Sequence, residues 1–414
     1  MPSCPFFCHF ALMWQEGPNM VKRVMIRAAL VVLSVCLASS AAADAYHPDI
    51  VKSQVVKLDA KSIEANANSG KPIDFVFGDT KLTVVLSPAP VWPKEGLTVI
   101  EVAEDGSTKK SIVKAANITY AGDVVGEDPD ESEARFTISG GVVDGYVMSS
   151  TGWWFIEPLT RFDPKAGSDQ YLVYATRDLD FPAVDYGDDG VKADEVTGWA
   201  PPQPPPNLEI PVVMVADREY VFIDSSPVID RQASLINRVN GIYGHQTGRT
   251  FKIVMSSIDL YNGTLKSTNA YALNMQLKCF IKGQPANCTP GSEYGSLNSM
   301  NVWFAHLTTG KVLTSGTDFR YGIGDEDGRF GLSQQSARVS LSAQNTMVAS
   351  HEIGHNFGGR HYAADHICLN GNCGYTLMWP QYYASNLAYF SDGLHAGKDN
   401  RTNIRNFMAA HGFF

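Results

Sequence analysis

The sequence predicts two folded parts: a mostly β domain, and then an α/β domain. The chain has 414 residues of ordinary globular composition and is too long for one average domain. Strand-like runs fill residues 46–182, and strand-like and helix-like runs alternate over residues 208–414. Residues 183–207 lie between them, and we interpret this stretch as a linker.

Residues 1–45 are typical of a leader rather than of a folded domain. Three basic side chains precede the apolar run of residues 28–38, and small residues follow it. This order is that of a secretory signal peptide, and the run is too short for a stable membrane span. We therefore expect a secreted protein without a stable membrane anchor, with its true start at Met20 or Met25.

The N-terminal domain, residues 46–182, is predicted from short runs of β-branched and aromatic residues. Gly, Pro, Asn and Asp separate these runs. The clearest of them are Phe75–Phe77, Leu82–Leu86, Leu97–Val102 and Tyr171–Tyr174.

The linker is predicted from its composition. Acidic residues are frequent from Asp178 to Glu195, and a proline-rich run from Pro201 to Pro206 follows. Such a run favours extended polyproline geometry and cannot enter the interior of a sheet.

The C-terminal domain, residues 208–414, is predicted from strands and helices in alternation. The predicted strands are Ile210–Ala216, Phe251–Met255 and Val302–Ala305. The predicted helices run from Ser226 or Pro227 to Tyr243, from Ala343 through His355, and from Thr402 to His411.

Charge and cysteine content restrict the partners and the compartment. A formal net charge of −10 argues against binding to nucleic acid or to anionic lipid. Of seven cysteines, three lie in the leader and four remain, an even number that indicates disulfides in an exported chain. Four cysteines allow three connectivities, and proximity favours Cys279 with Cys288 and Cys368 with Cys373.

The candidate metal site is a short segment of the second domain. His351 and His355 are four residues apart, so on a helix both imidazoles lie on one face, where they can share a cation. Gly358 tolerates the positive φ of an abrupt helix end, which would return His361 to the metal as a third ligand. Three histidines leave one zinc position open, as catalytic zinc sites do. Glu352 lies beside the first ligand and can take a proton from water.

The segment from His351 to His361 resembles the elongated zinc signature of the metzincin metalloproteases at every fixed position. Met378 is similar in place to the methionine of the metzincin Met-turn. Met378-Trp379-Pro380 and the later Tyr389 to Asp392 segment resemble the reprolysin (adamalysin, ADAM-like) family. The resemblance implies an α/β (α+β) catalytic domain with a twisted mixed sheet over the active-site helix. It also implies a zinc endopeptidase that cleaves proteins or peptides, with Glu352 as general base and Met378 supporting the histidines.

The N-terminal domain is similar to the reprolysin propeptide. Ile118 to Gly122, Phe155 to Leu159 and Tyr171 to Tyr174 follow the order of that region. The resemblance implies a proenzyme whose own prodomain acts as an intramolecular inhibitor and assists folding. The alternative is an unrelated β domain.

Several features depart from the reprolysin pattern. Tyr362 follows the third histidine where reprolysins usually have Asp, and Asp365 or Asp392 is a candidate substitute. Residues 46–207 contain no cysteine, which excludes a cysteine switch.

Two further interpretations concern calcium and function. The acidic run at residues 325–327 is a candidate calcium loop, although a solvated turn is the favoured interpretation. The alternative function is a catalytically silent binding or adhesion protein on the same fold.

Overall fold

The computed structural model describes most of the chain after the leader. The described residues are 46–114, 117–180, 184–185, 209–261, 263–283, 297, 299–316, 318–326, 328–336, 340–361, 366–369, 372–378, 381–382, 399–411 and 413. For residues 184–185, 366–369, 372–375 and 381–382 the description is of the backbone. All described residues belong to one compact unit, Ser40–Phe414.

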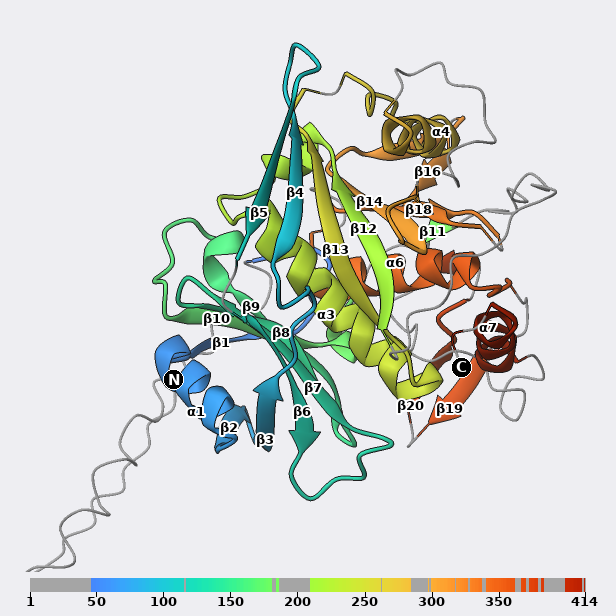
Figure 1. Cartoon of the computed structure of the whole chain (residues 1–414). Helices are drawn as coiled ribbons and strands as arrows, with labels where there is room; N and C mark the ends of the chain where they lie inside the picture. Colours follow the sequence, from blue (N-terminus) through green and yellow to red (C-terminus); the bar gives the residue numbers. More distant parts are fainter. Residues whose placement is uncertain are drawn as a thin grey trace, which may run out of the picture. The chain divides into compact units, whose positions relative to one another are not determined.

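Eight strands of the N-terminal part form an antiparallel sheet in the order β1-β10-β9-β8-β7-β6-β3-β2 (Figure 1). Three of the four strand predictions for this part lie in it, at β2, β3 and β10. The strands are β1 (Gln54–Lys57), β2 (Pro72–Phe77), β3 (Thr80–Pro88), β6 (Thr119–Val124), β7 (Glu133–Ser139), β8 (Val142–Ser149), β9 (Gly152–Pro158) and β10 (Gln170–Ala175).

One helix of this part, α1 (Ala60–Ser69), was not predicted from the sequence. Asp59 caps its first turn by accepting from backbone N–H groups, and Gly70 ends it at a φ of 62°. Its buried face is small, with Ala60, Ile63 and Ala67. This narrow stripe gives a weak periodic signal, and the two caps are the clearer signs of the helix.

The C-terminal part is built on a seven-stranded mixed sheet in the order β17-β18-β14-β12-β13-β4-β5. The five central strands run parallel to their neighbours, and the two outer strands pair antiparallel. The strands are β4 (Leu97–Val102), β5 (Thr108–Val113), β12 (Glu209–Ala216), β13 (Thr250–Asp259), β14 (Phe304–Thr309), β17 (Gly322–Gly324) and β18 (Phe330–Gln334).

The hairpin of β4 and β5 joins the two parts of the chain. The strand predicted at Leu97–Val102 is present, but it lies in the mixed sheet, where Thr98 pairs with Met255 and Val102 with Asp259. The mixed sheet therefore contains strands from both sides of the expected linker at 183–207.

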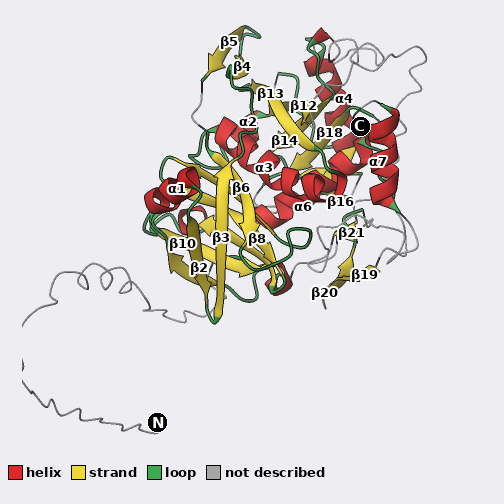
Figure 2. Cartoon of the chain, turned by 60° about the horizontal axis from the view of Figure 1, so that its bottom comes forward, coloured by secondary structure: helices red, strands yellow, loops and turns green. Residues whose placement is uncertain are grey.

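Two long helices pack against the mixed sheet, and most of their residues are buried in the interior of the protein (Figures 1 and 2). α3 (Val228–Thr247) runs between the two sheets and is buried along most of its length, including its polar side chains. It extends four residues beyond the predicted end at Tyr243, because its positive-φ cap is Gly248, at 71°, and not Gly244. α6 (Ser342–Asn356) matches the predicted second helix and is buried throughout.

The opposite face of the mixed sheet packs on α4 (Ala270–Ile281), which the sequence reasoning missed. α7 (Asn400–Ala410) matches the predicted last helix, and β14 begins two residues after the predicted Val302. The remaining elements are short: α2 (Arg218–Val221), β11 (Val184–Asp185), β15 (Leu313–Ser315), β16 (Asp318–Arg320), β19 (His366–Leu369), β20 (Asn372–Tyr375) and β21 (Gln381–Tyr382).

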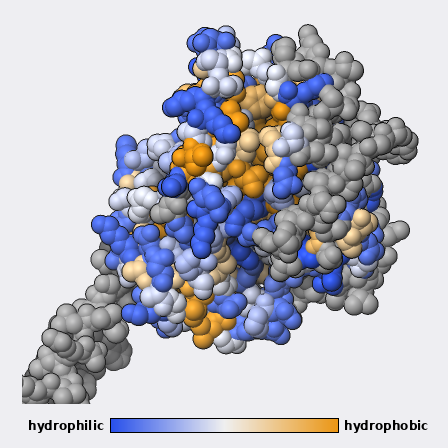
Figure 3. Space-filling model, viewed as in Figure 1, coloured by the Kyte–Doolittle hydropathy of each residue, from blue (hydrophilic) through white to orange (hydrophobic). Residues whose placement is uncertain are grey.

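The surface of the described residues is mixed in character. On the face seen in Figure 3, hydrophobic side chains gather mainly in the upper half, around the strands of the mixed sheet. Within the described ranges, no helix combines the length and the apolar character that crossing a membrane would need.

Candidate metal centre

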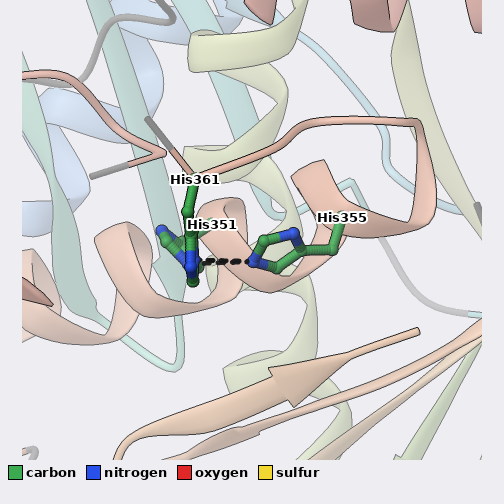
Figure 4. Close-up of side chains that lie close together, drawn as sticks. All are labelled: His351, His355 and His361. Carbon is green, nitrogen blue, oxygen red and sulfur yellow. Dashed lines mark hydrogen bonds between the residues drawn. The ribbon is translucent and has the colours of Figure 1, made fainter. Parts of the chain in front are cut away.

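The predicted metal ligands converge on one point. His351 and His355 lie one turn apart on α6, both buried, and their rings point toward His361, which comes from the chain beyond the helix (Figure 4). These three residues are the one group of His, Cys, Asp or Glu in the described part of the chain that is arranged to hold a metal ion.

Gly358 makes this convergence geometrically feasible. Its φ of 82° ends α6 in the left-handed conformation predicted from the sequence. The Gly358 N–H donates to the His355 carbonyl at 3.1 Å, and the Gly359 N–H donates to the Gly354 carbonyl at 2.8 Å. These two bonds form a Schellman motif, which reverses the chain within two residues and directs it back to the helix.

The distances between the three rings fit a metal ligand set. The Nε2 atom of His351 lies 3.1 Å from Nε2 of His355 and 3.0 Å from Nε2 of His361, and the third separation is 3.1 Å. Zinc–nitrogen bonds of about 2.0–2.1 Å in a tetrahedral site place ligand nitrogens roughly 3.3–3.4 Å apart. The three nitrogens are therefore placed to share one small cation, and the donor set of three imidazoles suits zinc.

Backbone carbonyls fix the tautomer of two of the ligands. Nδ1 of His351 lies 2.7 Å from the carbonyl oxygen of Leu377, and Nδ1 of His355 lies 3.0 Å from that of Gly359. A carbonyl accepts only, so Nδ1 carries the proton and Nε2 presents its lone pair toward the shared point. The sequence reasoning missed these contacts, because carbonyls leave no signature in a sequence.

Electrostatics keep the same rings neutral. Burial lowers the pKa of His351 well below its ordinary value, and the neighbouring His355 and His361 lower it further. Burial and His361 do the same to the pKa of His355. Because a metal binds the neutral imidazole, these shifts favour the form that can act as a ligand.

Glu352 lies on α6 beside the edge strand β17. Its side chain is fully buried and packs against Gly322, where an added β-carbon would lie 2.6 Å from Oε1. At Gly324 a β-carbon would lie 2.3 Å from the backbone oxygen of Glu352 and 3.0 Å from the Cβ of His355. The two glycines share one face of β17. Because neither has a side chain, α6 and the Glu352 carboxylate can approach this edge strand closely.

Asn400 forms two hydrogen bonds with the backbone of Arg360, the residue before the third ligand, His361. Its Oδ1 accepts from the Arg360 N–H at 2.8 Å, and its Nδ2 donates to the Arg360 carbonyl at 2.9 Å. Asn400 is fully buried at the start of α7, so the residue directly before His361 is tied on both sides. The sequence did not predict this role of Asn400, because a contact across 40 positions has no local signal.

Met378 is fully buried, and its methyl group reaches Gly359 in the turn after α6. The neighbouring Leu377 supplies the carbonyl that contacts Nδ1 of His351. Tyr362, Asp365 and Asp392 lie outside the described residues.

The cysteine predictions are only partly within the described chain. The register of β19 and β20 places Cys368 opposite Cys373, as the expected pairing requires. Cys279 is buried in the last turn of α4, and Cys288 lies outside the described residues.

The calcium alternative gains no support from the acidic loop. The buried carboxylate of Asp325 lies 3.0 Å from Nζ of Lys278, and that of Glu326 lies 3.0 Å from Nη1 of Arg360. Asp327 lies outside the described residues. Both described carboxylates therefore face a protein cation, which disfavours a second positive charge between them.

The sequence that contains this metal centre matches a known family. Residues 229–362 match the family model described as metallo-peptidase family M12B, reprolysin-like, and they carry a reprolysin-like metallopeptidase domain. Among solved structures, metalloproteinase-II from Bacteroides fragilis is similar at 10% identity and a TM-score of 0.41, over 84% of this chain and 94% of that chain. Archaemetzincin from Methanopyrus kandleri is similar at 14% identity and a TM-score of 0.33, over 50% of this chain and 98% of that chain. No curated protein matches the sequence.

Proposed function

We propose that the chain is the precursor of a secreted, zinc-dependent endopeptidase that hydrolyses peptide bonds in protein substrates. The observation that carries this proposal is the convergence of three imidazole nitrogens, from the buried His351 and His355 and the partly buried His361, beside Glu352 in a reprolysin-like metallopeptidase domain. Export rests on the signal-peptide pattern of residues 1–45, and it is consistent with the disulfides proposed for Cys279 with Cys288 and Cys368 with Cys373.

Each site residue has a distinct proposed role. His351, His355 and His361 hold zinc, which when bound supplies Lewis-acid polarisation to water and to the scissile carbonyl. Glu352 takes the proton of the attacking water and passes it to the leaving amine. Met378 supports the histidines through its turn. Hydrolysis then needs no covalent intermediate with the protein.

The peptide substrate is proposed to lie along β17, the outer strand of the mixed sheet. An extended peptide can add to an exposed sheet edge through main-chain hydrogen bonds. Gly322 and Gly324 keep this strand close to Glu352, so a peptide bound along it would pass the general base.

The N-terminal part is proposed to inhibit the enzyme within the precursor. The backbone of β11, directly after the N-terminal domain, pairs antiparallel with β21, with Val184 opposite Tyr382 and Asp185 opposite Gln381. β21 begins three residues after Met378, so the paired segment lies next in sequence to the Met-turn. In this proposal the pairing restricts the access of a substrate to the site, and cutting the linker releases it.

The proposal is tested with purified protein cleaved in the linker. We expect it to degrade casein, and a zinc chelator to stop the degradation. Glu352→Ala should retain zinc, measured by mass spectrometry, and lose activity by at least about 100-fold. The control is Glu101→Ala, since Glu101 is a carboxylate on the surface hairpin, paired with Lys109.

Two outcomes would contradict the proposal that the protein is an enzyme. One is casein cleavage that does not respond to the chelator, and the other is no cleavage after the linker has been cut. The second would favour the alternative, a catalytically silent binding protein that uses this fold.

A further inference from the structure

The helix that carries the candidate site takes its N-terminal cap from the other part of the chain. The N-cap position of α6 is Leu341, whose side chain has no acceptor for the first N–H groups of the helix. The Ser342 N–H instead donates to Oε1 of Glu157 on β9, at 2.9 Å. The Ala343 N–H donates to the hydroxyl of Tyr174 on β10, at 3.4 Å.

Glu157 is held in place for this contact. Its carboxylate is fully buried, accepts a hydrogen bond from the Tyr174 hydroxyl and pairs with Arg161. A carboxylate at a helix N-terminus also interacts favourably with the helix dipole. The N-terminal domain therefore supplies both the hydrogen-bond acceptor and the negative charge that α6 lacks.

A second carboxylate, which is largely covered, links the N-terminal domain to both central helices. Asp144 on β8 lies 3.1 Å from Arg238 of α3 and 3.2 Å from Arg161, and it accepts from the Ser342 hydroxyl at 3.2 Å. Arg238 in turn donates to the Thr346 hydroxyl of α6 at 2.8 Å. Burial by itself would raise the pKa of Asp144, but Arg238 and Arg161 outweigh it, and the pKa lies below its ordinary value.

The two parts pack directly against each other around this cluster. One hydrophobic core contains side chains of both, including Phe155 and Leu172 from the N-terminal sheet and Ile236 from α3. Asn237 of α3 donates to the Phe136 carbonyl at 2.9 Å. At Gly241 of α3 a β-carbon would lie 1.9 Å from the Tyr146 hydroxyl.

We propose that residues 46–180 stay bound after the linker is cut, as a permanent part of the active enzyme that caps and clamps the helix carrying His351, Glu352 and His355. Their removal would take Glu157 and Asp144 away from the first turn of α6 and would expose the apolar side of α3, and both changes are unfavourable. Activation then ends the pairing of β11 with β21, which accounts for the inhibition, and leaves residues 46–180 bound. This inference rests on the proposed function, because it concerns how that site is maintained and regulated.

Association is tested apart from activity, using the full chain. The chain carries Glu352→Ala to prevent self-cleavage, and a recognition site for a sequence-specific protease replaces residues 190–196. After cutting, we expect both pieces to elute together at the volume of the uncut chain in size-exclusion chromatography, with zinc retained. The unfolding midpoint should also stay near that of the uncut chain.

Variants of the cap test its contribution. Glu157→Leu removes the acceptor and the charge, so the dissociation constant of the two cut pieces should rise by at least about tenfold. Glu157→Gln keeps an acceptor oxygen and should raise the dissociation constant less. Asp74→Leu removes an exposed carboxylate, paired with Lys81, from the outer strand β2 of the same domain and should leave this dissociation constant unchanged.

The overturning result is a C-terminal piece that elutes alone, folded, zinc-bound and with an unchanged unfolding midpoint. Precipitation or zinc loss of that piece once the N-terminal piece separates would instead support its dependence on residues 46–180. Neither readout requires turnover, so a failed casein assay would count against the proposed activity and leave the association result standing.

Discussion

Gly322 lies against Glu352 so closely that a β-carbon there would fall 2.6 Å from the carboxylate Oε1. The same β-carbon would lie 2.6 Å from the Leu332 carbonyl oxygen on the neighbouring strand. A side chain at this position therefore has to move either the proposed general base or the edge strand.

Gly322→Ala should lower activity while leaving the metal bound. Displacement of Glu352 by a fraction of an ångström weakens proton transfer, and we expect kcat to fall by roughly 10- to 100-fold. Casein cleavage and zinc content, measured on the same preparation, check this. Gly263→Ala is the control, since its β-carbon would lie at an ordinary 3.4 Å from the Tyr261 ring. A Gly322→Ala enzyme with full activity would contradict the proposed role of Glu352's position.

Asn400→Leu should weaken zinc binding, because it removes both hydrogen bonds that tie Arg360 beside His361. Loss of a support of this kind typically costs about 10- to 100-fold in metal affinity. Asn400→Asp keeps an acceptor for the Arg360 N–H, so its zinc affinity should lie between that of the parent protein and that of Asn400→Leu. Competition with a chromophoric chelator measures the affinity.

The control for Asn400 is Thr402→Ala, which destroys the Asn400-Arg401-Thr402 sequon and leaves the Asn400 side chain in place. Zinc affinity equal to that of the parent in Thr402→Ala and reduced in Asn400→Leu would assign the effect to the hydrogen bonds. Equal affinity in all three proteins would show that Asn400 does not support the ligand.

Gly358→Ala should lower both stability and zinc affinity. At a φ of 82° an alanine costs roughly 1–2 kcal/mol, and the turn that returns His361 must deform to relieve it. Gly70→Ala, at a φ of 62° after α1, introduces the same kind of strain far from the site. We expect both variants to lose stability in urea unfolding and only Gly358→Ala to lose zinc affinity.

Acid should destabilise the protein partly through His306 on β14. Burial lowers the pKa of His306 to about 3, whereas an unfolded histidine titrates near 6.5. Its contribution to stability is therefore complete above about pH 6.5 and is lost as the pH falls toward 3, with a slope of up to about 1.4 kcal/mol per pH unit. In His306→Gln the decline in unfolding free energy over this range should be shallower. Parallel pH profiles of the two proteins would contradict the assignment.

The local geometry of the site was predictable from the sequence, because helix periodicity and one glycine determine it. The four-residue spacing of His351 and His355 sets their common face, and the positive φ at Gly358 returns the chain. The supports of the site were not predictable. Leu377 acts through its carbonyl, and Asn400 acts across 40 positions, so neither residue type carries a signal.

In the fold, too, features set by the local sequence were predictable and features set by distant contacts were not. Strands such as β2 and β12 were predicted from their own composition, and the missed helix α1 has recognisable caps in Asp59 and Gly70. The sheet to which β4 belongs was not predictable, because its alternation is equally compatible with either sheet. Only the distant strand β13 determines that choice.

The pairing of β4 with β13 has a consequence for biosynthesis. The ribosome releases β4 long before β13 exists, so the hairpin has one strand edge without its native neighbour while the intervening chain is made. Non-local parallel pairing of this kind is slow and leaves the edge open to aggregation in the meantime. A nascent chain truncated before residue 250 should therefore need a holding chaperone, and a chain extended beyond residue 259 should not.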